Sequence, residues 1–296
     1  MSRWIDLHLH SNCSDGALPP GEVVRKAAAA GLLAVAIADH DNVDGIDEAM
    51  AAGHSCAVEV LPAVELSVVW QSFQDIHLLG YCFDPHHPEL CAALAEFRDF
   101  RNGRNEQIVT RINQRLTAEG RAPLDFAAIR QRAGGTLGRP HIALELMAQG
   151  HVRSKDEAFD RYLVPCNVAK RFFPIEEAIA LIQRAGGVTS LAHPAYISRD
   201  RKVLAQLFDD FVDCGLEGIE VYSNQASNDD IDWLLSEANR RRLLITGGSD
   251  FHGGHEEELV IGGLRGNLRV PYRCVEDLRS AATQRQAGDP GLASRS

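Results

Sequence analysis

Short apolar runs alternate with amphipathic segments along most of the chain. The runs that predict strands are residues 3–10, 33–41, 59–69, 75–82, 188–194, 216–223 and 243–252. The segments that predict helices beside them are residues 21–31, 44–52, 175–187, 203–215 and 228–242. Alternation of strand and helix favours a parallel sheet, and seven strands suit a distorted barrel better than an open sheet with one switch point.

The rhythm breaks in the middle of the chain. Residues 88–175 are rich in Arg, mostly helical in pattern, and contain no convincing strand. We therefore predict an α/β protein, a distorted (β/α)7 barrel formed by residues 1–87 and 176–285, with a mostly helical insertion at 88–175. The polar stretch 286–296 predicts a loose tail.

Composition narrows the classes of protein further. The 296 residues are 45% hydrophobic, which is enough for a large core, and no apolar run approaches the roughly 20 residues of a membrane span. Seven scattered cysteines without a CxxC pair and the lack of an N-terminal leader predict reduced thiols in the cytoplasm. The net charge of −11 argues against a surface built for duplex nucleic acid, but leaves room for a local cationic pocket.

Residues that bind metals recur at or near the predicted strand ends, in "LHLH", "ADHD", "VELS", "DIHLL", "LAHP" and "GSDFH". The candidates are His8, His10, Asp15, His40, Glu65, His77, His193, Asp250 and His252. Each alone has an ordinary explanation, such as a hydrogen-bonded core histidine or a helix N-cap. In a β/α barrel, however, the carboxyl ends of the strands converge on one face. As a set, these residues therefore predict one metal centre.

The same motifs, read in order, resemble those of the polymerase and histidinol phosphatase (PHP) family, a group of amidohydrolase-like barrels. The resemblance covers residues 3–82 and 186–253. It implies up to three metal ions. By that pattern, the first ion is held by His8, His10, Glu65 and Asp250, the second by Glu65, His77 and His193, and the third by Asp15, His40 and His252.

The chemistry of this set agrees with the resemblance. Six imidazoles and three carboxylates suit Mn, Fe or Zn better than Ca or Mg alone, and we expect Mn²⁺. Three divalent ions with three carboxylates would carry a charge of about +3, so we expect the site to bind an anionic substrate. The shared ligands leave coordination positions open, as in catalytic sites. Asp39 and Asp41 flank His40 and either orient it or cap the loop.

We expect the insertion at 88–175 to cap the active site, and it carries candidates for substrate binding. In "GGTLGRPHIALELMAQG", Pro140 is the expected first helical residue, which sets Arg139 and His141 at a helix N-terminus, where phosphate binds readily. The further candidates are Lys170, Arg171 and Arg104. The alternative for all of these cations is a solvated helix face.

"GRPHIA" and "AFDRYL" resemble a free-standing PHP subgroup of 3′,5′-nucleotide bisphosphate phosphatases and 5′-to-3′ short-RNA exonucleases. The resemblance implies a metal-dependent phosphoesterase that removes the 3′-phosphate from a nucleoside 3′,5′-bisphosphate such as pAp. His193, Asp250 or a metal-bound water would move protons. The alternatives are an exonuclease on short RNA, a phosphomonoesterase of the histidinol phosphate type, and a non-catalytic nucleotide-sensing or accessory metal-binding module.

Overall fold

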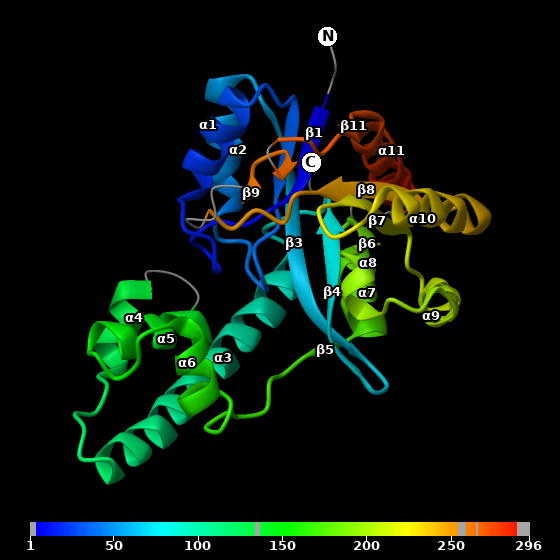
Figure 1. Cartoon of the computed structure of the whole chain (residues 1–296). Helices are drawn as coiled ribbons and strands as arrows, with labels where there is room; N and C mark the ends of the chain where they lie inside the picture. The colour runs from blue at the N-terminus through cyan, green and yellow to red at the C-terminus, as the bar shows by residue number, and fades with distance from the viewer. Residues whose placement is uncertain (1–3, 134–136, 254–258, 265, 289–296) are drawn as a thin grey trace. The chain divides into compact units, whose positions relative to one another are not determined.

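The computed structural model describes residues 4–133, 137–253, 259–264 and 266–288 (Figure 1). The chain packs as two compact units. The first, here called the barrel unit, comprises residues 1–92 and 172–296, and the second, here called the insertion, comprises residues 93–171. The mixed α/β fold with a nearly closed sheet confirms the predicted fold class.

All seven predicted strands are present in the barrel unit. They are β1 (Trp4–Leu9), β2 (Ala34–Ile37), β3 (Glu59–Trp70), β4 (Phe73–Tyr81), β6 (Val188–Leu191), β7 (Gly218–Ser223) and β8 (Leu244–Gly248). Four two-residue strands were not predicted: β5 (Phe173–Pro174), β9 (Leu259–Val260), β10 (Gly263–Leu264) and β11 (Val270–Pro271). The main sheet runs β11-β1-β2-β3-β4-β6-β7-β8, with β5 beside β3. β5 falls inside the segment for which the sequence predicted no strand.

The prediction of a parallel sheet is wrong for β4. This strand runs antiparallel to both β3 and β6, whereas the β1–β2, β2–β3, β6–β7 and β7–β8 pairs are parallel. Only Gln71, with a φ of 51°, and Ser72 separate β3 from β4. A parallel pair needs a long crossover, so a two-residue connection can only form a hairpin.

The two ends of the sheet meet and nearly close the barrel. The backbone N–H of Asp250 donates to His8 O at 2.8 Å, and that of His10 donates to Phe251 O at 2.9 Å. A Cβ added at Gly248 would lie 2.3 Å from the Cβ of His8, so only glycine permits this approach. The closure brings the carboxyl ends of β1 and β8 to the same mouth.

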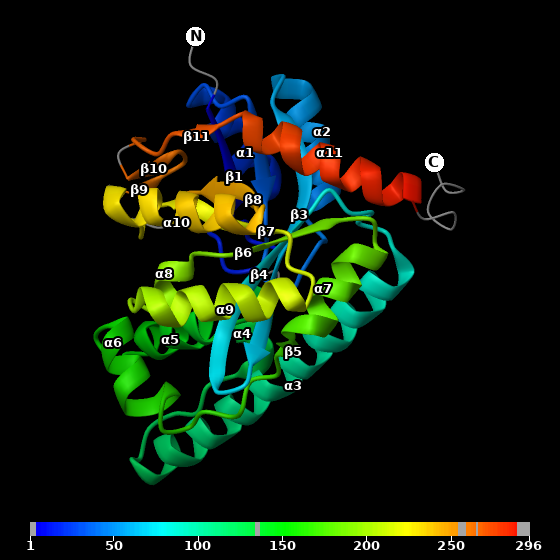
Figure 2. The same cartoon turned by 90° about the vertical axis from the view of Figure 1, so that its right-hand side faces the viewer.

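Amphipathic helices cover the sheet. The barrel-unit helices are α1 (Pro20–Ala29), α2 (Ile46–Cys56), α7 (Ile175–Arg184), α8 (Pro194–Ile197), α9 (Arg201–Asp213), α10 (Asn228–Arg241) and α11 (Arg273–Gly288). In α7, for example, Ile175, Ile179 and Ile182 recur at helical spacing and are buried. Figure 2 looks onto α9, α10 and α11 along one side of the sheet. Since α11 reaches Gly288, the first three residues of the predicted loose tail are helical, and residues 289–296 lie outside the described ranges.

The insertion has a core of its own. It contains most of α3 (Pro88–Ala118), with α4 (Phe126–Ala133), α5 (Arg139–Ala148), α6 (Lys155–Ala158) and a π-helical turn, η1 (Phe159–Leu163). Ile112, Leu146 and Tyr162 are completely buried in this core. None of the helices in the described part of the whole chain combines the length and the apolar character needed to cross a bilayer.

Candidate metal centre

The nine candidate ligands lie together at the mouth of the barrel. Glu65 and His77 are in β3 and β4, His8 is in β1, and the others follow strand ends: His10 and Asp15 after β1, His40 after β2, His193 after β6, and Asp250 and His252 after β8. A Cβ added at Gly16 would lie 2.6 Å from the His10 carbonyl oxygen. The glycine therefore allows the loop that carries Asp15 to fold back toward the mouth.

Glu65 is the centre of the cluster. Its side chain is fully buried, and the imidazoles of five histidines surround its two oxygens. The nitrogens nearest to a Glu65 oxygen are His40 Nδ1 at 2.9 Å, His77 Nδ1 at 3.0 Å, His193 Nε2 at 3.1 Å, His8 Nε2 at 3.3 Å and His10 Nε2 at 3.4 Å. A single carboxylate is therefore in reach of ligands assigned to all three predicted ions.

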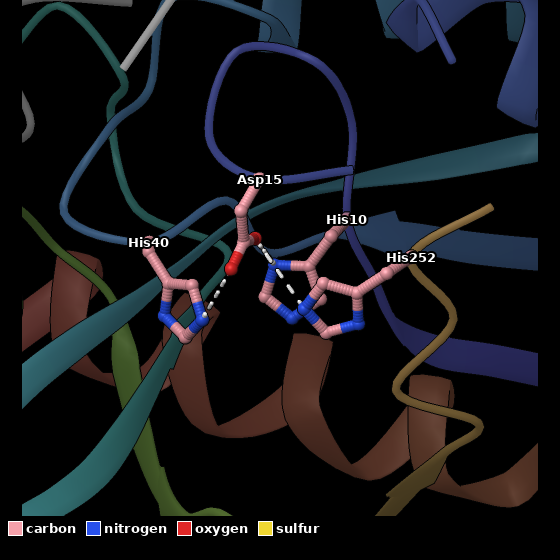
Figure 3. A group of neighbouring side chains, drawn as sticks. All are labelled: His10, Asp15, His40 and His252. Atoms are coloured by element: carbon pink, nitrogen blue, oxygen red, sulfur yellow. Dashed lines mark ion pairs between the residues drawn. The ribbon is translucent and has the colours of Figure 1, made fainter. Parts of the chain in front are cut away.

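A second acidic group, Asp15, lies between His40 and His252 (Figure 3). Its Oδ2 is 3.6 Å from His40 Nε2, and its Oδ1 is 3.3 Å from His252 Nε2. The rings of His10 and His252 stack with centroids 4.1 Å apart. This part of the centre is the more open one, since about a third of the Asp15 side chain is exposed.

Asp250 and His193, the two candidates for proton transfer, also belong to the cluster. Asp250 Oδ1 is 3.2 Å from His10 Nε2, and His193 Nε2 is 3.3 Å from His77 Nδ1. Both residues have a positive φ, 56° for Asp250 and 27° for His193. Such backbone conformations are costly outside glycine and are found at functional sites, where surrounding contacts hold them.

Three groups of side chains in the described part of the chain are close enough to share one ion. They are His8, His10 and Glu65; His40, Glu65 and His77; and His10, Asp15, His40 and His252. His10, His40 and Glu65 each fall into two of these groups, and Asp250 and His193 fall into none of them, so the number of ions and the assignment of ligands to each stay predictions.

Donor atoms in the cluster fit a metal. The buried atoms without a hydrogen-bond partner among the described residues include His8 Nε2, both ring nitrogens of His10, His40 Nδ1, Glu65 Oε2 and His193 Nδ1. A buried polar atom left without a partner costs roughly 1–3 kcal/mol. Nitrogen and oxygen donors at this density suit a transition metal such as Mn, Fe or Zn.

The pKa values in the cluster show that, in the absence of metal, the ionised carboxylates favour protonation of some of the surrounding imidazoles. Burial raises the pKa of Glu65, but the imidazoles around it, led by His77, outweigh burial and hold this pKa well below its usual range. Burial lowers the pKa of His10 to about 4, which leaves its ring neutral at pH 7. Although burial lowers the pKa of His40, attraction to Glu65 and Asp15 raises it to about 9. The ionised carboxylates thus recruit positive charge that a metal ion would supply instead.

Asp39 and Asp41 anchor the loops that carry the ligands. Asp39 accepts hydrogen bonds from the backbone N–H of Ser11 at 2.8 Å and from the hydroxyl of Ser14 at 2.5 Å. Asp41 accepts from the backbone N–H of Ser67 at 2.8 Å and from its hydroxyl at 3.0 Å. These contacts tie the segments next to His10 and His40 to neighbouring parts of the sheet. The choice between orienting His40 and capping its loop stays a prediction.

Sequence reasoning missed Glu220, a fully buried carboxylate in β7. Its Oε1 is 3.0 Å from His8 Nδ1. The signal in the sequence was a lone acid inside the apolar strand "GIEVYS". An unpaired buried charge is costly, so such a residue is expected to have a specific partner.

The five candidates for substrate binding all lie in the insertion. Arg104 is buried, and its guanidinium donates to Val168 O at 2.8 Å and to Asn167 Oδ1 at 2.7 Å. Arg171 Nη2 is 3.2 Å from Glu96 Oε2. Lys170 next to it is half-buried.

The other two candidates lie at the start of α5, which begins at Arg139 rather than at Pro140 as predicted. The Arg139 guanidinium is over the ring of Phe159, 5.5 Å from its centroid. His141 Nδ1 accepts a hydrogen bond from the backbone N–H of Gly138 at 3.1 Å. A contact of any of the five with substrate stays a prediction.

Known proteins match this chain along most of its length. The PHP domain family model matches residues 6–163. A 3′,5′-nucleoside bisphosphate phosphatase of Chromobacterium violaceum is 36% identical, covering 86% of this chain and 92% of that protein. A 5′-3′ exoribonuclease of Haemophilus influenzae is 34% identical, covering 85% and 91%. The crystal structure of a Bifidobacterium adolescentis protein, assigned by similarity as a metal-dependent phosphoesterase, has a TM-score of 0.80 at 29% identity, covering 95% of this chain and 97% of that one.

The family match spans more than half of the chain, and both relatives exceed 30% identity over most of their own length. The relatives are named as enzymes, so the alternative of a non-catalytic module is not retained. The chain therefore belongs to the PHP-domain family and is a metal-dependent phosphoesterase.

Proposed function

We propose that the protein removes the 3′-phosphate from nucleoside 3′,5′-bisphosphates and releases the nucleoside 5′-monophosphate and inorganic phosphate. The observation that carries the proposal is the cluster of nine predicted ligands, in which five imidazoles surround Glu65 and buried donor atoms have no hydrogen-bond partner in the described ranges. The activity named for the Chromobacterium relative supports the choice of substrate. A nucleotide substrate also supports a cytoplasmic location.

The nine side chains would hold up to three ions, Mn²⁺ in the first place and Fe or Zn as alternatives. When bound, such ions supply Lewis-acid activation and neutralise charge on the phosphoryl oxygens. The Asp250 side chain is one-fifth exposed. Burial raises its pKa, but the imidazoles of His8 and His10 prevail and hold the pKa well below its usual range. Its carboxylate is thus ionised at neutral pH, which is the form that can hold a metal ion. Asp250 and His193 are the two residues that we propose for proton transfer.

The insertion would cap the site and bind the phosphate that does not react. It carries fourteen Lys and Arg against nine Asp and Glu, a net charge of +5, whereas the barrel unit carries sixteen against thirty-two, a net charge of −16. A cationic unit in an acidic protein suits a doubly phosphorylated substrate. The proposed contacts are Arg139, His141, Lys170 and Arg171, and binding away from the reacting phosphate would orient it. Arg104 is assigned first to the fold of the insertion, because its guanidinium donates to Val168 O and Asn167 Oδ1.

A 5′-to-3′ exonuclease that acts on short RNA is the second candidate, because the Haemophilus relative is named for that activity. Both reactions break a phosphate ester on the 3′ oxygen of a nucleotide with a 5′-phosphate. The net charge of −11 favours the small substrate, since affinity for longer strands depends on neutralising several phosphates.

The test is an assay of phosphate and mononucleotide release by Mn²⁺-loaded protein on pAp, 3′-AMP, 5′-AMP, histidinol phosphate and a short 5′-phosphorylated RNA. We expect pAp to have the highest kcat/KM and to compete with the RNA for one site. Faster release of mononucleotides from the RNA, with pAp acting only as an inhibitor, would favour the exonuclease. Histidinol phosphate as the best substrate would contradict both.

A further inference from the structure

Glu220 is a buried acid that none of the nine predicted ligand positions includes. It lies in β7 between Ile219 and Val221, and its side chain is completely shielded from solvent. Moving a carboxylate out of water is costly unless it is hydrogen-bonded and paired. Specific partners must therefore compensate the cost of burying Glu220. Its two oxygens contact two different predicted metal ligands.

The first contact is with the ring of His8. Glu220 Oε1 lies 3.0 Å from His8 Nδ1. A carboxylate oxygen accepts, so Nδ1 carries the proton and the neutral ring has its lone pair on Nε2. That nitrogen faces Glu65 Oε1 at 3.3 Å and Asp250 Oδ1 at 3.6 Å. It is also buried without a hydrogen-bond partner in the described part of the chain, as expected for a metal ligand.

The second contact is with the backbone of His193. Glu220 Oε2 accepts a hydrogen bond from the His193 N–H at 2.7 Å. His193 precedes α8 with φ 27° and ψ 62°, a conformation that is costly for a residue other than glycine. The bond holds this turn in place, and the turn directs His193 Nε2 to Glu65 Oε1 at 3.1 Å.

We propose that Glu220 is a positioning residue that prepares two ligands of the metal centre at once. One of its oxygens sets the tautomer of His8, assigned to the first ion, and the other holds the strained backbone of His193, assigned to the second. The inference rests on the metal centre of the proposed function and not on the identity of the substrate. Carboxylates that orient metal-binding histidines contribute about 10–100-fold in metal affinity.

The Glu220→Gln variant tests the inference because it preserves shape. Its amide oxygen can still accept from the His193 N–H, but its NH₂ group then faces His8 Nδ1 and cannot accept the proton there. His8 must then carry its proton on Nε2, the nitrogen aimed at the metal. We expect Mn²⁺ affinity, measured by titration calorimetry on metal-free protein, to fall about 10–100-fold. The melting temperature of the metal-free protein should change little.

Glu217→Gln is the matched control, since Glu217 directly precedes β7 and its carboxylate binds Arg285 at 2.5 Å. It should keep the Mn²⁺ affinity of the wild type. Equal Mn²⁺ affinity in the Glu220→Gln variant and the wild type would overturn the inference. So would an equal loss of affinity in the Glu217→Gln control.

A measurement on the wild type keeps the inference testable if Glu220→Gln does not fold. Long-range ¹H–¹⁵N NMR of the Zn²⁺-loaded protein reports which ring nitrogen of each histidine carries a proton. We expect a proton on Nδ1 of His8, and a proton on Nε2 would overturn the inference. A protein that binds Mn²⁺ with the wild-type tautomer but does not hydrolyse nucleotides would remove the proposed substrate and still support the role of Glu220.

Discussion

The barrel mouth and the insertion hold their charged side chains in opposite ways. At the mouth, donor atoms of His8, His10 and Glu65 are buried and have no hydrogen-bond partner among the described residues. In the insertion, Arg104 and Arg171 already contact groups of the insertion itself. A site whose polar atoms are left without partners is prepared for a ligand, whereas a paired cation contributes first to its own fold. Changes at the mouth should therefore affect chemistry, and changes in the insertion should affect stability or substrate affinity.

Removal of metal should give the largest effect. We expect a chelator to abolish phosphate release, and Mn²⁺ to restore it. A ligand present at a hundred times its dissociation constant stabilises the fold by about 2.7 kcal/mol, so the melting temperature should rise with Mn²⁺ concentration. A melting temperature that does not respond to Mn²⁺, Fe²⁺ or Zn²⁺ would show that the unpartnered donor atoms at the mouth do not bind metal, and so would contradict the contrast with the insertion.

The Glu65→Gln variant should have the next largest effect. The amide keeps the size of the side chain but has no negative charge with which it would hold a metal ion. Loss of several kcal/mol of charge stabilisation corresponds to a fall in kcat of roughly a thousandfold or more. Glu157→Gln is the control, because it makes the same substitution in the insertion, where Glu157 Oε1 is 2.8 Å from Arg161 Nη1. This control should keep kcat within about twofold of the wild-type value. Similar losses in both variants would contradict the contrast.

The Arg104→Ala variant should mainly destabilise the protein. It leaves the carbonyl oxygen of Val168 and the side chain of Asn167 without a donor, which costs about 1.5–3 kcal/mol for hydrogen bonds to a charged group. Urea unfolding measures the loss. Unchanged stability together with a raised KM for pAp would instead make Arg104 a substrate contact, as proposed from the sequence.

The Arg139→Ala variant should have the smallest effect and the most selective one. We expect KM for pAp to rise about tenfold, the effect of one charged hydrogen bond of roughly 1.5 kcal/mol. Turnover of a simple aryl phosphate should not change, because that substrate has no second phosphate. Arg153→Ala in the same unit is the control. An equal loss with the aryl phosphate would show that Arg139 does not bind the second phosphate.

Much of the fold and the ligand set followed from local patterns. Seven apolar runs predicted the seven main strands, and residues of ligand type at their ends predicted a cluster that the structure brings around Glu65. Both signals are local, because strand character and strand ends depend on neighbouring residues. The antiparallel direction of β4 could also have been predicted from the sequence, since a two-residue connection between β3 and β4 permits only a hairpin.

Glu220 and Asp39 show what local patterns do not contain. The partners of Glu220 are 212 and 27 positions away along the chain, and those of Asp39 are 28 and 25 positions away. No spacing rule connects residues so far apart. Their roles depend on which strands become neighbours when the sheet closes.

The sequence by itself determined the family, the order of the strands along the chain, and the nitrogen and oxygen donors that lie at the mouth of the barrel. Only the tertiary structure decided which nitrogen of His8 faces Glu65, which histidines fall into more than one ligand group, and which arginines are already paired. The physical reason is range. Residue type and periodicity act over a few positions, whereas hydrogen bonds and metal coordination require atoms from distant segments to meet within about 3 Å.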